Sequence, residues 1–349
     1  MTSSTPTTSN SDRSHAATEA FAALERRLDE LVPQRLDEYK VPGAAVVVID
    51  GPQKLLRGYG LRRSRNPEAV GPDTIFEAAS LGKPLFAYAM LTMARQGKLD
   101  LDLTLSGKLN ELYVIDDARI DRVTARHVLS HTTGLPNWRP DRFSAQAKPL
   151  KFLRSPGSEF GYSGEGYMYL QAVIEKQSDE ALDRIMEALV FQPIGMPRTS
   201  YLWSDGFEAD FAMPHDHRGR AGEKWRIREA GAAYSLHTTA SDYAGFLRVM
   251  LEDDSELARA MLSPQIDLSA SAQLAWALGW GIERRADVDW FWHWGDNVGY
   301  KHFVMGSRSE KRAVLVFTNA RRGANVYRTV VEEVLGFLPD ALQQPYIQY

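Results

Sequence analysis

The nine residues Phe76-Glu77-Ala78-Ala79-Ser80-Leu81-Gly82-Lys83-Pro84 are the stretch on which the prediction of the fold depends. Proline fits the first turn of a helix, where its missing N–H leaves no hydrogen bond unmade, so Pro84 predicts a helix that starts near Ser80. The apolar run of residues 85–91 carries this helix into the core. Residues three apart lie on one helix face, so we expect the Ser80 hydroxyl and the Lys83 amine to lie side by side.

A serine and a lysine in this arrangement can act as a nucleophile and its base. A hydroxyl is a weak nucleophile, and a neutral amine within reach can accept its proton. The backbone N–H groups at a helix start also favour negative charge on a reacting oxygen. The alternative is an ordinary helix cap beside a solvated lysine, because Ser-x-x-Lys is a short pattern.

Composition narrows the class of protein. The 349 residues are 44% hydrophobic and 25% charged, which is typical of a globular chain that buries a sizeable core. The formal charge of -4 leaves no basic footprint, so we expect no nucleic-acid partner. The absence of cysteine excludes disulfides, thiol catalysis and thiolate metal sites. No run of about 18 apolar residues occurs, so no membrane partner is expected either.

The two ends of the chain have different patterns. Residues 1–14 are rich in Ser and Thr without the apolar core of a signal peptide, which predicts a disordered tail and a cytoplasmic protein. From Ala16 an amphipathic helix is expected to end before Val41-Pro42-Gly43. Its apolar positions at helical spacing are Phe21, Leu24, Leu28, Leu31 and Leu36.

Strand patterns occur near both ends of the chain. The β-branched run of residues 44–49 and its hairpin partner at residues 55–59 come first. Three more strands are expected at residues 290–292, 303–305 and 313–317, followed by a helix over residues 325–337. Between the two groups the pattern is helical for about 150 residues. This predicts an α+β fold, in which an antiparallel sheet is built from both chain ends, flanked by helices, and interrupted by a large all-helical insertion.

We therefore expect a single catalytic domain over residues 15–349. Its α/β part would comprise residues from about 15 to 78 and from about 236 to 349, and its helical part those from about 79 to 235. A cleft is expected where the insertion meets the sheet. The oligomeric state stays open.

Two further motifs fit that cleft. Tyr162-Ser163-Gly164 lies in a glycine-rich turn before a helix at residues 168–176, so the turn can present the Tyr162 phenol as a proton-transfer group. The alternative is a tyrosine packed at a turn. His293-Trp294-Gly295 ends the aromatic strand, where the histidine could donate to a substrate and the glycine permits close backbone approach.

In this order, Ser80-Leu81-Gly82-Lys83, Tyr162-Ser163-Gly164 and His293-Trp294-Gly295 resemble the three motifs of the class C β-lactamase and penicillin-binding-protein-like serine hydrolases, a superfamily that includes family VIII esterases. The resemblance covers residues 20–340 approximately and implies a β-lactamase/transpeptidase-like fold. It also implies that Ser80 is the nucleophile of an acyl-enzyme, with Lys83 and Tyr162 moving protons. The backbone N–H groups of Ser80 and Asp296 would form the oxyanion hole.

Two departures from the family pattern bear on the substrate. Gly164 stands where β-lactamases carry an asparagine that holds the substrate's amide, and His293 stands where they carry a lysine. Both changes favour an esterase, lactonase, amidase or transacylase over a β-lactamase or D-amino-acid peptidase. The expected ligand is a small acyl compound, contacted by residues of the second and third motifs, and no cofactor is needed. The predicted substrate-binding and oxyanion residues are Gly164, His293, Trp294, Gly295 and Asp296.

The sequence argues against three other kinds of function: a Ser-His-Asp hydrolase, a metal site and a catalytically silent ligand sensor. A Ser-His-Asp hydrolase needs a Gly-x-Ser-x-Gly elbow, which does not occur in the chain. The pair in His215-Asp216-His217 is expected to face solvent, so no metal site is predicted. His127 and His131 are expected to be hydrogen-bonded structural residues. The alternating Trp290, Trp292 and Trp294 would line the core or one wall of the cleft. A catalytically silent ligand sensor would be expected to lack one of the three catalytic residues.

Overall fold

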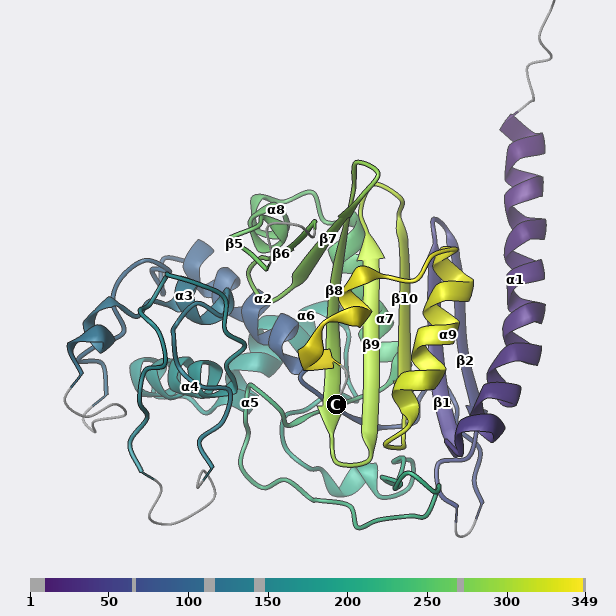
Figure 1. Cartoon of the computed structure of the whole chain (residues 1–349), viewed down its shortest axis with the longest axis horizontal. Coiled ribbons are helices and arrows are strands. Elements are labelled where there is room, and N and C mark those ends of the chain that lie inside the picture. The colour runs from purple at the N-terminus through teal and green to yellow at the C-terminus, as the bar shows by residue number, and fades with distance from the viewer. Residues whose placement is uncertain (1–9, 65–66, 110–116, 141–147, 269–272, 348–349) are drawn as a thin grey trace, which may run out of the picture.

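The computed structural model describes residues 10–64, 67–109, 117–140, 148–268 and 273–347. At its centre lies an antiparallel eight-stranded sheet with the strand order β2-β1-β10-β9-β8-β7-β6-β5 (Figure 1). The strands are β1 (Gly43–Asp50), β2 (Gln53–Gly60), β5 (Ile266–Asp267), β6 (Leu274–Trp276), β7 (Gly281–Arg285), β8 (Val288–Asn297), β9 (Tyr300–Ser307) and β10 (Arg312–Thr318). A separate two-stranded sheet joins β3 (Phe76–Ala79) and β4 (Leu236–Thr238).

The sheet unites the two ends of the chain, as predicted. Strand β1 pairs with its hairpin partner β2 on one side and with β10 on the other, where Val46 lies opposite Val316. The apolar runs of both strands are buried, because each strand has neighbours on both sides and packed layers on both faces. The α+β class and the expected origin of the sheet are therefore confirmed.

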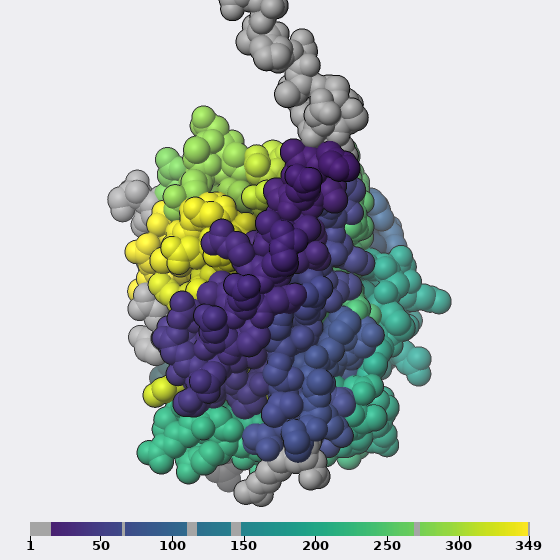
Figure 2. Space-filling view, turned by 90° about the vertical axis from the view of Figure 1, so that its right-hand side faces the viewer, coloured from purple at the N-terminus to yellow at the C-terminus, as the bar shows by residue number. Residues whose placement is uncertain are grey.

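Two helices from the chain ends cover one face of the sheet. Helix α9 (Gly323–Leu335) packs on β9 and β10, and α1 (Asn10–Tyr39) packs against α9 and β2 (Figure 1). In Figure 2, α1 lies diagonally across this side of the molecule. The predicted inward positions of α9, namely Val326, Val330, Val331 and Leu335, are all buried.

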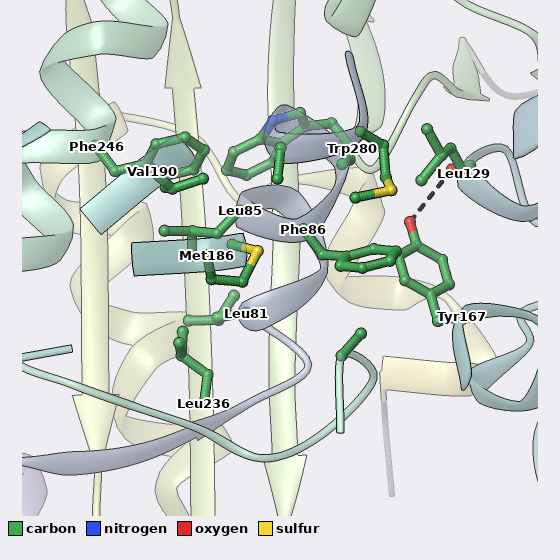
Figure 3. Packing of buried hydrophobic residues seen from close by; sticks show 14 of the residues in the cluster. Leu81, Leu85, Phe86, Leu129, Tyr167, Met186, Val190, Leu236, Phe246 and Trp280 are labelled. Atoms are coloured by element: carbon green, nitrogen blue, oxygen red, sulfur yellow. Dashed lines mark hydrogen bonds between the residues drawn. The ribbon is translucent and has the colours of Figure 1, made fainter. Parts of the chain in front are cut away.

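The opposite face of the sheet is covered by helices that include α2 (Gly82–Arg95) and α7 (Ala240–Glu252). Helix α2 is buried for most of its length, and Leu85 and Phe86 lie among side chains from distant segments such as Met186, Phe246 and Trp280 (Figure 3). This packing fixes the start of α2, and with it Ser80 and Lys83, in the molecule.

The remaining described helices are α3 (Ala125–Leu129), α4 (Gly164–Ser178), α5 (Leu182–Met186), α6 (Gln192–Ile194) and α8 (Glu256–Leu262), with short 3₁₀ or π turns between some of them. None of the helices in the described part of the chain is long and apolar enough to cross a membrane.

Three details differ from the prediction. Helix α1 begins at Asn10, earlier than expected, and residues 1–9 of the predicted tail lie outside the described residues. The short strands β3 to β7 were not predicted. The insertion is not helical throughout, because residues 195–235 run irregularly along the sheets and are held by isolated bridges such as Ile75 to Phe211 and Ser200 to His237.

Candidate active site

Ser80 lies in a tight turn between β3 and α2. The pairing of β3 with β4 shifts register between Glu77 and Ala79, and Ala79 adopts a left-handed backbone conformation with φ of 54°. A non-glycine residue in this conformation stores strain, which is typical of functional turns. Helix α2 begins at Gly82, two residues beyond the predicted start. The turn therefore presents the Ser80 side chain at the mouth of a buried helix.

Lys83 meets the Ser80 hydroxyl inside the protein. Its Nζ donates to Ser80 Oγ over 2.9 Å and to the carbonyl oxygen of Ala233 over 2.6 Å. Ser80 Oγ donates to the same carbonyl over 3.3 Å. Lys83 is fully buried, whereas Ser80 is partly exposed. The predicted neighbourhood of the two side chains is confirmed, and Ala233 joins them as a contact that no sequence pattern indicated.

Tyr162 completes this cluster from the turn before α4. Lys83 Nζ lies 4.8 Å from the centroid of the Tyr162 ring. The phenol oxygen is buried and has no hydrogen bond of ordinary geometry among the described residues. Burial raises the pKa of the Tyr162 phenol, while the nearby Ser80 hydroxyl acts in the opposite direction. The three predicted catalytic side chains therefore come together, and the phenol is held in its protonated form.

His131 holds the Tyr162 turn on both sides. Its carbonyl oxygen accepts from the Gly161 N–H over 2.8 Å, and its Nδ1 accepts from the Ser163 N–H over 3.0 Å. Burial, with Lys83 and His293 nearby, lowers the pKa of the His131 imidazole well below its ordinary value. A neutral ring is required for Nδ1 to accept a hydrogen bond. The predicted structural role of His131 is confirmed.

The third motif lies beside β3, but its histidine does not face the cavity. His293 is fully buried, and its ring lies 5.2 Å from that of Trp294, measured between ring centroids. Burial and the charge of Lys83 lower the pKa of His293 to about 3. Trp294 lines the cavity, whereas His293 does not and lies buried beside Tyr162, with 6.2 Å between the two ring centroids. The predicted contact of His293 with a substrate is therefore corrected.

Gly295 has a different function from the one expected. A Cβ atom at this position would lie 2.5 Å from the carbonyl oxygen of Ala78. The glycine therefore lets β8 approach β3, rather than a bound acyl group. This contact brings Asp296, the next residue, to the same cavity as Ser80. The Ser80 N–H makes no backbone hydrogen bond within the described ranges, so it is available as an oxyanion donor.

Ser80 opens into a cavity of about 1010 Å³. Asp296 lines it and forms an ion pair with Lys301; burial raises the pKa of the Asp296 carboxyl, and Lys301 acts against this shift. Arg321 also lines the cavity. Both cations follow the third motif in the chain, and sequence analysis missed them because they belong to no short motif.

Gly164 is covered by Trp138. A Cβ atom at position 164 would lie 2.3 Å from the indole, and the Gly164 N–H donates to Asn137 Oδ1 over 3.0 Å. Trp138 and Asn137 line the cavity, whereas Gly164 does not. The space that a side chain at position 164 would need is thus occupied by Trp138, and Asn137 binds the backbone there; the sequence pattern singled out neither residue.

His215, one of the two histidines considered as metal ligands, makes hydrogen bonds within the protein. His215 is buried rather than solvent-facing; its Nδ1 lies 2.8 Å from the carbonyl oxygen of Asn319, and its Nε2 accepts from the Ser64 N–H over 3.3 Å. The described residues contain no cluster of three or more acidic, histidine or cysteine side chains that could hold a metal ion.

A protein-family model described as Beta-lactamase matches residues 28–333 of the chain. The chain belongs to the Beta-lactamase family. The match spans the sheet and the three motifs, so the resemblance that the motifs indicated is confirmed.

Among curated members, Esterase EstB of Burkholderia gladioli is 31% identical over 235 residues, which cover 60% of this chain and 58% of EstB. Unguisins hydrolase of Aspergillus campestris is 22% identical over 91% of this chain and 66% of its own length. The chain thus spans less than two thirds of these two relatives.

Solved structures show the same fold. The octameric penicillin-binding protein homologue from Pyrococcus abyssi superposes with a TM-score of 0.77 at 22% identity, covering 90% of this chain and 78% of the homologue. D-alanine carboxypeptidase AmpC from Burkholderia cenocepacia gives the same TM-score at 18% identity, with 90% of this chain and 99% of that chain covered. At these identities the likeness concerns the β-lactamase-like fold alone.

Proposed function

We propose that this Beta-lactamase family member is a serine hydrolase that cleaves esters through an acyl-enzyme on Ser80. The observation that carries the proposal is the buried Lys83 amine, 2.9 Å from the Ser80 hydroxyl at the floor of an open cavity. A buried amine that touches a hydroxyl can accept its proton once the amine is neutral.

The reaction follows from the positions of the three side chains. Ser80 Oγ attacks the ester carbonyl carbon and passes its proton to Lys83, while the N–H groups of Ser80 and Asp296 stabilise the negative oxygen. The tetrahedral intermediate collapses to an acyl-serine, and the departing alkoxide takes a proton from the Lys83–Tyr162 pair. Water then attacks the acyl-serine and gives up one proton to the same pair. The pair returns this proton to the departing Ser80 oxygen, and the acid is released.

Two features favour an ester over a β-lactam or peptide. The third motif presents a buried histidine, whose pKa is lowered to about 3, instead of a lysine, so it gives the substrate no positive charge near neutral pH. The second motif has no asparagine at position 164. The similarity to Esterase EstB supports the same choice. Lys301 and Arg321 leave the cavity some positive charge, and for this reason a penicillin belongs in the test.

The test compares hydrolysis of p-nitrophenyl butyrate with that of benzylpenicillin, using the native chain and Ser80→Ala. We expect release of p-nitrophenol that depends on Ser80. For the penicillin we expect a kcat/KM at least about 100-fold lower, because the motif side chains that would hold it by hydrogen bonds are absent. Adding an amine or alcohol acceptor distinguishes hydrolysis from acyl transfer. Faster turnover of the penicillin than of the ester would contradict the proposal.

A further inference from the structure

The side chain of Asn297 connects three segments that surround the active site. Its Nδ2 donates to Glu77 Oε1 over 2.5 Å and to the carbonyl oxygen of Tyr234 over 3.1 Å. Because both partners are acceptors, the carboxamide must turn its NH₂ group toward them, and both N–H groups are used. Asn297 ends β8, Glu77 belongs to β3, and Tyr234 lies in the irregular segment that leads into β4.

Two of these segments carry the proposed oxyanion donors. Asp296, whose N–H is one of them, directly precedes Asn297. Ser80, whose N–H is the other, follows Glu77 by three residues, through the left-handed backbone conformation of Ala79. The hydrogen bond between Glu77 and Asn297 therefore joins β3 and β8 beside the place where the two N–H groups must converge on one oxygen.

The third segment carries the acceptor for the lysine amine. Tyr234 directly follows Ala233 in the chain. The carbonyl oxygen of Ala233 accepts from Lys83 Nζ over 2.6 Å and from Ser80 Oγ over 3.3 Å. Since Asn297 binds the next carbonyl oxygen along the same turn, its carboxamide also restrains the group that orients the amine and the hydroxyl.

The carboxylate that holds Asn297 is itself anchored by a buried ion pair. Glu77 and Lys224 are both buried, and Lys224 Nζ bonds to Glu77 Oε2. Lys224 Nζ also donates to the carbonyl oxygen of Trp225 and to His237 Nε2, both over 3.1 Å. Burial and the charge of Lys224 lower the pKa of His237 well below its ordinary value, so its ring is neutral and can accept. Charge-assisted hydrogen bonds of this kind are strong and directional.

We propose that Asn297 is a positioning residue for ester hydrolysis, because its carboxamide sets the two oxyanion N–H groups relative to each other and to the acceptor of Lys83. This inference rests on the proposed ester hydrolysis at Ser80. The Glu77–Lys224 pair anchors the carboxamide and does not line the Ser80 cavity. Asn297 lines that cavity, but both of its N–H groups are bound within the protein and cannot donate to a substrate.

The effect is expected in the transition state. Negative charge develops on the carbonyl oxygen only as Ser80 attacks, so misplaced donors weaken binding of the transition state more than binding of the ester. A displacement of about 1 Å can cost about 100-fold in rate. Loss of the Asn297 carboxamide should therefore lower kcat more than it changes KM.

The first test measures hydrolysis of p-nitrophenyl butyrate by the native chain and by Asn297→Ala. We expect kcat to fall about 10- to 100-fold and KM to change less than about threefold. Phenylboronic acid forms a tetrahedral adduct with a serine oxygen and mimics the intermediate. Its inhibition constant should rise by about the same factor as kcat falls, a change that a merely structural role would not produce.

Two double variants test the anchor of the carboxamide. Glu77→Met/Lys224→Met replaces the ion pair by apolar side chains, so no buried charge is left unpaired, but Asn297 loses an acceptor. Glu77→Gln/Lys224→Met removes the same ion pair and keeps an amide oxygen for the Asn297 NH₂ group. We expect the first variant to lose about 5- to 30-fold in kcat and the second to recover most of that loss. Urea denaturation checks that both variants are folded.

The outcomes separate this inference from the proposed function. Native kcat in Asn297→Ala, or equal kcat in the two double variants, would overturn the positioning role while leaving ester hydrolysis intact. A loss confined to KM would overturn it too, because Asn297 would then act by binding the substrate. If the native chain showed no Ser80-dependent hydrolysis, the proposed function itself would fail, and this inference with it.

Discussion

The floor and the walls of the Ser80 cavity are built from different kinds of structure. Ser80 and Lys83 lie three residues apart at the start of α2, and Tyr162 lies two residues before α4, so each belongs to a short motif at a helix start. The wall residues Asn137 and Trp138 come from an irregular segment, and Ala233, whose carbonyl contacts Ser80 and Lys83, comes from another. From this contrast we expect the chemistry to depend mainly on the two short motifs and the choice of substrate to depend on how distant loops pack.

The largest effect is expected at the floor. Ser80→Ala or Lys83→Met should each lower ester kcat/KM at least about 10³-fold, and the double variant should be little worse, because residues that act as one unit are not additive. Steady-state kinetics with a p-nitrophenyl ester measure this effect. Losses that multiply in the double variant would show that the two side chains act independently. This result would contradict the expectation that Ser80 and Lys83 act as one unit at the floor of the cavity.

The second effect tests how a distant residue supports the floor. Gln171 of α4 accepts from the Ala232 N–H and donates to the Ala230 carbonyl, both over 2.8 Å, which holds the segment that carries the Ala233 carbonyl. Gln171→Leu leaves two backbone groups unpaired and should lower the free energy of unfolding by about 2–4 kcal/mol. Urea denaturation measures this, with Gln192→Leu at an exposed position as the control.

A third effect, which is spread over several pH units and absent near neutral pH, concerns the buried histidines. The pKa of folded His293 is lowered to about 3, and an unfolded histidine has a pKa of about 6.5, so the unfolded chain binds more protons between these values. Stability should therefore fall as the pH drops from about 6.5 toward 3, by up to about 1.4 kcal/mol per pH unit for each such histidine. His293→Gln should flatten this dependence in acid denaturation, whereas His217→Gln, at an exposed position, should not.

The smallest effect is expected at the far wall. Trp225→Ala should lower kcat/KM about 3- to 10-fold for esters with a large aromatic acyl group and leave acetate esters unchanged, because only the larger group reaches the cavity of about 790 Å³ that Trp225 lines beside the Ser80 cavity. The matched control is Leu103→Ala, which removes an apolar side chain that is 60% exposed and lines neither cavity. An equal loss with acetate esters would assign Trp225 a general structural role.

The same contrast explains what could be predicted from the sequence. The strands β1 and β10 follow from continuous apolar runs that are buried on both faces, and the helices α1 and α9 follow from apolar periodicity, because each helix buries one face. The short strands β5 to β7 escaped prediction, because a segment of two to five residues becomes a strand through its neighbours in the sheet.

Within the site, the motifs predicted which side chains meet but not how all of them face. His293 was expected to touch substrate, yet it is fully buried and does not line the cavity. The sequence showed that the motif asparagine is absent at Gly164, but not that Trp138 packs on this glycine and that Asn137, 27 residues earlier in the chain, accepts from its N–H. Such long-range contacts leave no short pattern in the chain.

We propose above all that Ser80 is the nucleophile and that Lys83 activates it. Intact-protein mass spectrometry after mixing with a fluorophosphonate, followed by peptide mapping, tests this claim without knowledge of the substrate. We predict a single adduct on the peptide that contains Ser80, absent in Ser80→Ala and formed far more slowly in Lys83→Met. An adduct on another residue, or an unchanged rate in Lys83→Met, would contradict the account.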